Sequence, residues 1–249
     1  MKRIRYTLCV LTWLGLVLAL TIDTGAAQNL ADILDYYDER ELTAEVSANG
    51  IDEILLVGHD GKAVIEVGDD DRIMLRVTIK AKRRGLVYKS SAGRAYVEDA
   101  RLKADERRGT LEVTLSDGRG RKNVEEAWTI VVPRRLAVVA EMSAAQIEIT
   151  DVTGGVEVHL GVGKVEIDVP RGSIKVKVIV GNAIVTTATD SFGDVDLRAQ
   201  VGNTRLWLGG HRIKYPDPPG PGSKISMEGE GRDQVSVYVQ VGDAFLRIG

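Results

Sequence analysis

The sequence predicts an all-β protein whose second half is a β-solenoid, a stack of short strands in successive coils. The 249 residues include 27 glycines and only 2 phenylalanines, and valine occupies many of the apolar positions, a composition that favours strands. From Glu45 onward apolar and polar residues alternate with period two, the pattern of half-buried strands. Residues 136–249 then repeat one pattern several times, which is typical of stacked repeat architectures.

The repeat aligns on a small residue at a short turn. Ser143, Gly163, Gly181, Gly202 and Gly242 fall into one column, with spacings of 20, 18, 21 and 40 residues. The last gap corresponds to two repeats, one of them interrupted. Positions one, three, five and seven residues before the column are apolar in every copy, which predicts one buried strand face per copy.

Two arrangements of the repeat remain open. In a solenoid each copy is one coil, and equivalent strands stack in parallel about 4.8 Å apart. In a set of hairpins, Gly181-Asn182, Gly202-Asn203 and Gly242-Asp243 would form two-residue turns. The near-constant period and the match of apolar positions favour the solenoid. The residues expected to line its shared interior are Val158, Val176, Leu197 and Val237.

Residues 1–27 have the three-part pattern of a secretory signal peptide. A basic start is followed by an apolar run from Tyr6 to about Ile22 and then by small residues. An uncleaved membrane anchor is the alternative, although the run is short for a span. We expect a periplasmic, secreted or cell-surface protein. Its only cysteine, Cys9, lies in the signal, so the mature chain has no disulfide and no thiol chemistry.

Residues 28–44 predict a short helical lead-in, because apolar residues recur there at helical spacing. Residues 45–135 predict antiparallel strands joined by turns, and Pro133 ends this part or marks a sheet edge. No flexible linker separates this part from the repeat, so we expect one continuous body. The expected strands are Ile54–Val57, Ala63–Val67, Ile73–Ile79, Tyr96–Ala104, Leu111–Leu115 and Trp128–Val132.

An insertion at 209–223 interrupts the repeat and supplies the candidate binding surface. It holds four of the six prolines, so it is not regular strand. Loops at coil corners often carry binding, although a tolerated insertion is the alternative. Trp207 stands at an outward position beside it and would contact a sugar or a protein, unless a loop shields it. The candidate residues are Trp207, His211, Arg212 and Tyr215.

No catalytic, cofactor-binding or metal-ligating residues are expected. His59, His159 and His211 are far apart and lack metal-ligand spacing. The acidic cluster of Asp190, Asp194 and Asp196 would serve an enzyme only if one acid lay in a pocket that shifts its pKa. The formal net charge is -3 with no basic block, which argues against nucleic acid as a partner.

The order of segments resembles a known family. A signal peptide precedes GHDGKAVIEVGDDDRIMLRV and WTIVVPRRLAVVAEMSAAQIEITDVTGGVEVHLGVGKVEI, and glycine-cornered Val/Ile strands follow. This resembles the bacterial putative-adhesin domain family over Ile51–Gly249. The resemblance implies an exported stack of short strands with no established biochemical activity, and no functional residue is carried over. Ser143 departs from the usual corner glycine, and the 209–223 insertion is not part of the common pattern.

We therefore expect an exported, non-enzymatic structural or adhesion-like binding protein of the bacterial envelope, with a protein or a glycan as partner. A polysaccharide-acting enzyme and an envelope-signalling accessory protein are the alternatives. The final stretch, Val235–Gly249, is expected at an open sheet end. Unpaired backbone groups there would permit self-association.

Overall fold

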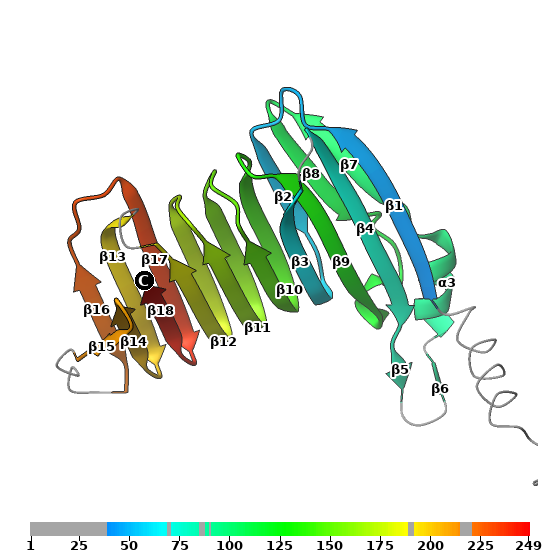
Figure 1. Cartoon of the computed structure of the whole chain (residues 1–249). Coiled ribbons are helices and arrows are strands. Elements are labelled where there is room, and N and C mark those ends of the chain that lie inside the picture. The colour runs from blue at the N-terminus through cyan, green and yellow to red at the C-terminus, as the bar shows by residue number, and fades with distance from the viewer. Residues whose placement is uncertain (1–38, 69–70, 85–87, 90, 189–191, 215–220) are drawn as a thin grey trace, which may run out of the picture.

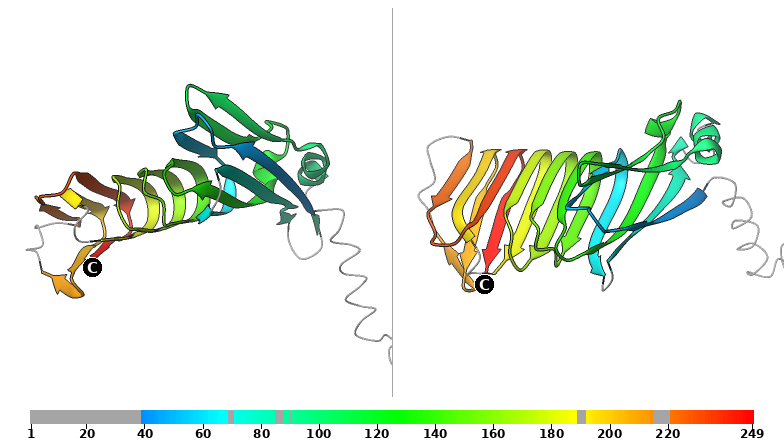
Figure 2. Two further views of the ribbon diagram at one scale, coloured as in Figure 1. Left: turned by 45° about the horizontal axis from the view of Figure 1, so that its top comes forward. Right: turned by 90° about the horizontal axis from the view of Figure 1, so that it is seen from above.

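The computed structural model describes residues 39–68, 71–84, 88–89, 91–188, 192–214 and 221–249. The expected signal peptide and residues 28–38 of the helical lead-in lie outside the described residues. The described chain is all-β with one α-helix, and its elongated body is shown in Figures 1 and 2. The first part contains β1 (Glu39–Ser47), β2 (Glu53–Val57), β3 (Asp60–Gly68), β4 (Arg72–Ala81), β5 (Arg83–Arg84), β6 (Tyr88–Lys89), α3 (Ser91–Asp99), β7 (Leu102–Arg107), β8 (Thr110–Leu115), the 3-10 turn η1 (Arg121–Asn123) and β9 (Val124–Pro133).

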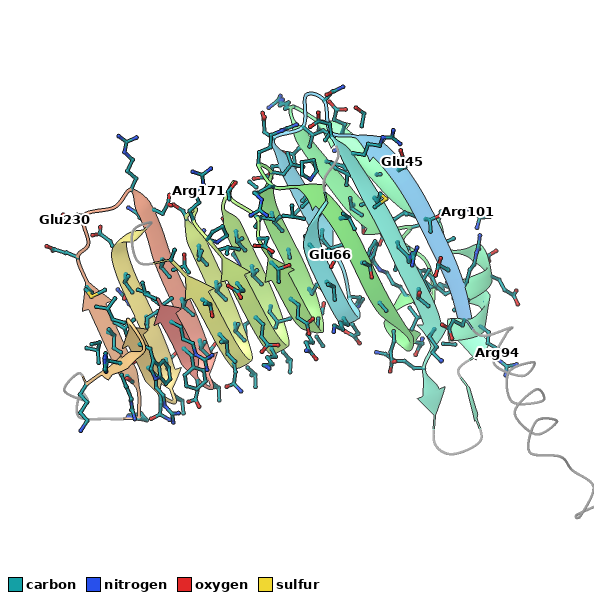
Figure 3. The ribbon with its side chains drawn as sticks, viewed as in Figure 1. Glu45, Glu66, Arg94, Arg101, Arg171 and Glu230 are labelled. Atoms are coloured by element: carbon teal, nitrogen blue, oxygen red, sulfur yellow. The ribbon has the colours of Figure 1, made fainter. Side chains whose placement is uncertain are left out.

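The second part consists of strands alone. Its members are β10 (Ala137–Thr150), β11 (Val156–Val169), β12 (Ile174–Thr187), β13 (Phe192–Val201), β14 (Thr204–Leu208), β15 (His211–Ile213), β16 (Ser223–Met227), β17 (Asp233–Val241) and β18 (Ala244–Ile248). They belong to an open, mixed sheet of 16 strands whose main path is β1-β4-β9-β3-β10-β11-β12-β17-β13-β16. At the turns of the stack, charged side chains such as Arg171 and Glu230 project into solvent (Figure 3).

The long strands β10, β11 and β12 each bend and contribute to two layers. The first half of β10 pairs with β2 and its second half pairs with β3. Likewise, β12 pairs with β17 before its bend and with β18 after it. The core lies between the two layers, because the side chains that face inward from both halves are buried.

Equivalent residues of successive copies stand side by side. Val158, Val176, Val237 and Leu197 form one row across four parallel strands, and each is at most 1% exposed. Burying one such side chain contributes about 1.5–3 kcal/mol. The predicted shared interior is therefore confirmed. Within the described copies, the segment before the corner does not pair with the segment after it, as hairpins would require.

Glycine is required at the corner because the strands approach closely there. Gly163, Gly181, Gly202 and Gly242 have φ between +131° and +140°. A Cβ on any of them would lie 1.7–1.9 Å from a carbonyl oxygen of the neighbouring strand. In the first copy the residue opposite Gly163 is Ala145, so the predicted alignment on Ser143 was wrong by two residues. A shift of two preserves which side chains face inward.

The valines immediately before the corner are not buried, contrary to the simple repeat pattern. The bend interrupts the alternation of side chains, so that Ile179 and Val180 both face solvent. The valines at the position of Val180 in the other copies also face solvent. The exposed fractions are 53% for Val162, 42% for Val180, 45% for Val201 and 42% for Val241.

The last copy is inserted into the stack rather than added at its end. β17 pairs with β12 on one side and β13 on the other, and β18 lies between β12 and β14 (Figure 1). The prediction of an open sheet end at Val235–Gly249, and of self-association through it, was therefore wrong. The outer strands of this part are β16 and β15.

The first part is mixed rather than antiparallel. β1, β4 and β9 pair antiparallel, as do β7 and β8, but β2 and β3 pair in parallel with their neighbours in the sheet. Residues 39–44, expected in the lead-in, belong to β1. The strand predicted at Tyr96–Ala104 was also wrong, because α3 occupies Ser91–Asp99. Tyr96, Val97 and Ala100 form a buried helical stripe there.

Candidate binding surface

Four outward side chains of β14 and β18 form what we call the arginine–aromatic cluster. The two strands pair in parallel, with Arg205 opposite Phe245 and Trp207 opposite Arg247. Because side chains alternate along a strand, these four share the outer face, while Leu206 and the residue opposite it, Leu246, are fully buried. Burial of the intervening leucines fixes the register that brings cations and rings together.

Each arginine of the cluster lies over an aromatic ring of the neighbouring strand. The Cζ of Arg205 is 5.1 Å from the centroid of Phe245, and the Cζ of Arg247 is 5.7 Å from that of Trp207. The two rings lie 6.1 Å apart at 51°. Cation–π contacts at exposed sites contribute about 0.5–1 kcal/mol each. The rings therefore restrict the arginines without neutralising their charge.

A polar ladder fixes the strands at the corner next to the cluster. The backbone N–H and the side-chain amide of Asn203 donate to Oδ1 of Asp243, at 2.9 and 3.2 Å. The backbone N–H of Asp243 in turn donates to Oδ1 of Asn182 at 3.0 Å. These bonds link the corners of three neighbouring coils, so the starts of β14 and β18 are held in register.

The short strand β15 extends the surface. It pairs antiparallel with β14, which places Arg212 opposite Trp207 and His211 opposite Leu208. Residues directly opposite one another share a face of the sheet. Arg247 and Arg212 thus flank Trp207 in one row, each about 4.8 Å away in strand spacing. Both arginines and His211 are exposed, and Trp207 is half-buried.

The positive charge of this surface is not neutralised within the described chain. Arg205, Arg212 and Arg247 form no ion pair with a described carboxylate, and Nε of Arg205 is buried without a hydrogen-bond partner. Several other arginines do form ion pairs with Asp or Glu side chains, namely Arg72, Arg76, Arg121, Arg134 and Arg198. The three guanidinium groups are therefore available to an anion.

Besides Asp243 at the adjacent corner, which accepts hydrogen bonds from Asn203, carboxylates lie two strands away from the cluster. The row through Arg247 continues to Thr186 and then Asp168, and the row through Phe245 continues to Ile184 and then Glu166. The outer face of this layer is thus cationic at β14, β15 and β18, whereas β11 carries the ion pair of Lys164 and Glu166 and the carboxylate of Asp168. Any anion that binds the cluster must fit within a few strands.

The structure brings together three of the four residues predicted from the sequence. Trp207, His211 and Arg212 lie on one surface, and Tyr215 falls outside the described residues. The sequence alone did not single out Arg205, Phe245 and Arg247. A signal existed, since Arg205 and Phe245 both stand three residues after a corner glycine, Gly202 and Gly242. The insertion of the last copy, which the sequence did not show, makes them neighbours.

Acidic side chains elsewhere in the described chain are held by hydrogen bonds and ion pairs. Asp196 is held by Arg198 at 2.7 Å on an exposed strand, and Asp190 lies outside the described residues. The buried carboxylate of Glu126 accepts hydrogen bonds from Nε1 of Trp128 at 3.0 Å and from Nε of Arg121 at 3.2 Å. Within the described ranges, no group of three or more His, Cys, Asp or Glu side chains is placed to hold a metal ion.

The pair of His59 and Asp60 is partly buried and lies 3.1 Å apart. Burial works to raise the pKa of Asp60, but hydrogen bonds from Lys82 and His59 outweigh it and hold the pKa below its ordinary value. A carboxylate stabilised in its charged form by a lysine orients its neighbours and makes a poor general acid.

A shallow hollow of about 360 Å³ lies on the other layer, lined by Met142, His159, Lys177 and Ile179 among others. Nε2 of His159 lies 2.7 Å from Oε1 of Glu157, which also pairs with Lys175. Hydrogen bonds from Lys175 and His159 lower the pKa of Glu157. The hollow thus carries charges of both signs, from Glu141 and Lys177, unlike the arginine–aromatic cluster.

No protein-family model and no curated protein matches the sequence. Among solved structures, a putative cell adhesion protein from Clostridium sporogenes aligns over 85% of this chain and 100% of its own, with a TM-score of 0.51 and 16% identity. This chain has the fold of a bacterial putative adhesin. Putative adhesins from Parabacteroides distasonis and Bacteroides fragilis align over 84% of this chain and 97% of theirs, each with a TM-score of 0.31, at 10% and 12% identity.

The resemblance to the putative-adhesin family that the sequence suggested is thus confirmed for the fold. At these identities the likeness concerns the fold alone, so the chemistry of the arginine–aromatic cluster follows from this chain's own residues. Among the described residues, no helix has both the length and the apolar character needed to cross a membrane.

Proposed function

We propose that this chain is an exported, non-enzymatic, adhesion-like binding protein of the bacterial envelope. The observation that carries the proposal is the arginine–aromatic cluster, where unneutralised cations and half-buried rings share the outer face of β14 and β18. Aromatic and arginine side chains are the types most enriched at binding hot spots. Such a surface is suited to binding a partner without catalysing a reaction of that partner.

The architecture supports this function. The parallel, in-register pairing of β10, β11, β12 and β17 favours a β-solenoid-like stack for 136–249. A stack of this kind offers a long, rigid face with side chains at regular spacing. Rigidity reduces the entropy that binding would otherwise cost. The surface is therefore prepared for a partner before the partner arrives.

The N-terminal sequence supports export. The basic, apolar and small-residue segments of 1–27 follow the pattern of a cleaved signal. Expression of the full chain with fractionation of the cells, followed by N-terminal sequencing, tests this directly. Mature protein that starts near Gln28 in the envelope or medium is the expected result, and full-length protein retained in the cytoplasm contradicts it.

The binding function is tested with isolated bacterial envelope fragments and the purified chain without residues 1–27. Replacing Trp207 by Ala is expected to lower sedimentation with the fragments at least about tenfold. Tyr238→Ala is the matched control, because Tyr238 is a half-buried aromatic residue of β17 outside the arginine–aromatic cluster. Equal binding of the Trp207→Ala variant and the unaltered chain would show that the arginine–aromatic cluster does not bind the envelope fragments.

A further inference from the structure

We propose that the arginine–aromatic cluster, together with Arg212, binds a carboxylated sugar residue of an acidic glycan. This inference rests on the proposed binding function and names the chemistry of its ligand. Three properties of the surface carry it: the unneutralised guanidinium groups, the exposed parts of the rings between them, and the short extent of the cationic region.

The guanidinium groups select for a planar anion. Arg205, Arg212 and Arg247 meet no described carboxylate, and Nε of Arg205 has no acceptor. A guanidinium group offers parallel N–H donors that match the two oxygens of a carboxylate. Arg205 and Arg247 are also oriented by the rings beneath them, so little side-chain entropy is lost when they bind.

The rings select for a ligand that has an apolar side as well as a charge. Trp207 stands between Arg247 and Arg212 in one row, and Phe245 lies beside it in the next, next to Ile184. The C–H face of a pyranose ring packs against aromatic and aliphatic side chains of this kind. A sugar packed against the part of Trp207 that Arg247 leaves exposed would present its carboxylate to Arg247 or to Arg212.

The limited extent of the positive surface separates an acidic sugar from larger anionic partners. Glu166 is paired with Lys164, but the carboxylate of Asp168 lies two strands from Arg247 on the same outer face. That distance, roughly 10 Å, is comparable with the Debye length of about 8 Å at physiological salt. A membrane or a nucleic acid would bring further anions over Asp168 and be repelled there, whereas one or two sugar residues would not reach it.

The probe is a short oligogalacturonate, and the matched ligand control is the same oligomer with its carboxylates fully methyl-esterified. We measure binding to the chain without residues 1–27 by titration calorimetry and by the change in tryptophan fluorescence, in which Trp207 is the partly exposed ring and Trp128 is buried. The acid form is expected to bind at least about tenfold more tightly than the ester, because a hydrogen-bonded charge pair is lost in the ester. Equal affinity for the two forms would overturn the inference.

The protein side is tested with Arg247→Gln and Arg212→Gln, each expected to weaken binding of the acid form about tenfold while leaving the weak binding of the ester unchanged. Arg198→Gln is the control, since Arg198 is an exposed arginine of β13 already paired with Asp196. Equal losses in all three variants would mean that net charge alone is sensed, which contradicts a defined site. Circular dichroism confirms that each variant is folded.

Two further arms separate the other anionic partners. Vesicles that contain phosphatidylglycerol and a short single-stranded DNA are titrated under the same salt conditions. The inference predicts that both bind more weakly than oligogalacturonate, and tighter binding of either would overturn it. If oligogalacturonate fails to bind but Trp207→Ala still abolishes binding to envelope fragments, the ligand class is wrong while the proposed function stands. If both experiments fail, both proposals fall.

Discussion

The first part of the chain and the repeat are built from similar strands, yet different interactions hold them together. In 39–133 a buried carboxylate, Glu126, ties neighbouring segments together through Arg121, Trp128 and the backbone N–H of His59. In 136–249 rows of similar apolar residues and glycine corners hold neighbouring strands together. Both parts bury an apolar core, but the repeat builds it from similar contacts in every copy, whereas the irregular part adds a buried polar network to it.

The largest expected effect is at a corner of the repeat. Gly181→Ala places a Cβ 1.7 Å from the carbonyl oxygen of Gly163, at a residue with φ of +140°. Strain and the clash together should lower the free energy of unfolding by more than about 4 kcal/mol, measured by urea denaturation. Gly209→Ala, where nothing lies within 4 Å, should cost only about 1 kcal/mol. Similar costs for the two would contradict the close approach of the strands.

In the first part, Glu126→Gln should lower the free energy of unfolding by about 3 kcal/mol, because Arg121 loses its buried counter-charge. The neighbouring Glu125→Gln is the control. Glu125 is exposed, so its replacement should change stability by less than about 0.5 kcal/mol. An unchanged urea midpoint for Glu126→Gln would show that the buried network of Glu126 does not contribute to the stability of the first part.

Two valines of one strand test the rows of the repeat. Val176 is 1% exposed and Val180 is 42% exposed, although both fit the same apolar pattern in the sequence. Val176→Ala should cost about 2 kcal/mol, from two lost methyl-sized groups and the cavity left behind, whereas Val180→Ala should cost less than about 0.5 kcal/mol. Urea denaturation of both variants measures this, and a larger cost at Val180 would reverse the assignment of interior and surface.

The smallest expected effect concerns acid. Burial tends to raise the pKa of Asp60, but hydrogen bonds from Lys82 and His59 outweigh it and hold that pKa below its ordinary value. A carboxyl group of lowered pKa contributes stability that is fully present above its unfolded-state pKa and is lost as the pH falls through its folded-state pKa. For Asp60 the loss begins below about pH 4.

Lys82→Met should therefore narrow the difference between the free energies of unfolding at pH 6 and pH 3, measured by urea denaturation. The expected change is less than about 1 kcal/mol, because the groups are partly exposed. An unchanged difference would mean that the ion pair of Asp60 and Lys82 does not contribute to acid sensitivity.

The recurrence of apolar residues predicted which side chains are buried in the repeat. It did not predict the order of the strands in the sheet. The row of Val158, Val176, Leu197 and Val237 followed from apolar recurrence, because stacking places like on like. The place of β17 between β12 and β13 could not be predicted, since equivalent copies can exchange places without changing the pattern. For the same reason only Trp207, His211 and Arg212 of the proposed binding surface were named from the sequence.

The irregular first part was harder to predict for a different physical reason. A short amphipathic segment such as Ser91–Asp99 has too few apolar residues to separate helix from strand by periodicity. Parallel pairing of β2 and β3 depends on partners far along the chain, which local patterns do not reveal. The same limit applies to Glu126, whose burial depends on Arg121 and Trp128 rather than on its place in a strand.

The arginine–aromatic cluster exists only because the last copy is inserted into the stack, which places Phe245 and Arg247 beside Trp207. Paired cysteines test this directly in a chain without residues 1–27, which removes Cys9, the only native cysteine. Lys177 and Tyr238 stand opposite one another on β12 and β17, whereas Arg198 is one strand further. Disulfide geometry therefore permits a bond between positions 177 and 238 but not between 177 and 198. Mild oxidation should thus join Lys177→Cys to Tyr238→Cys, and a bond from Lys177→Cys to Arg198→Cys instead would contradict the account.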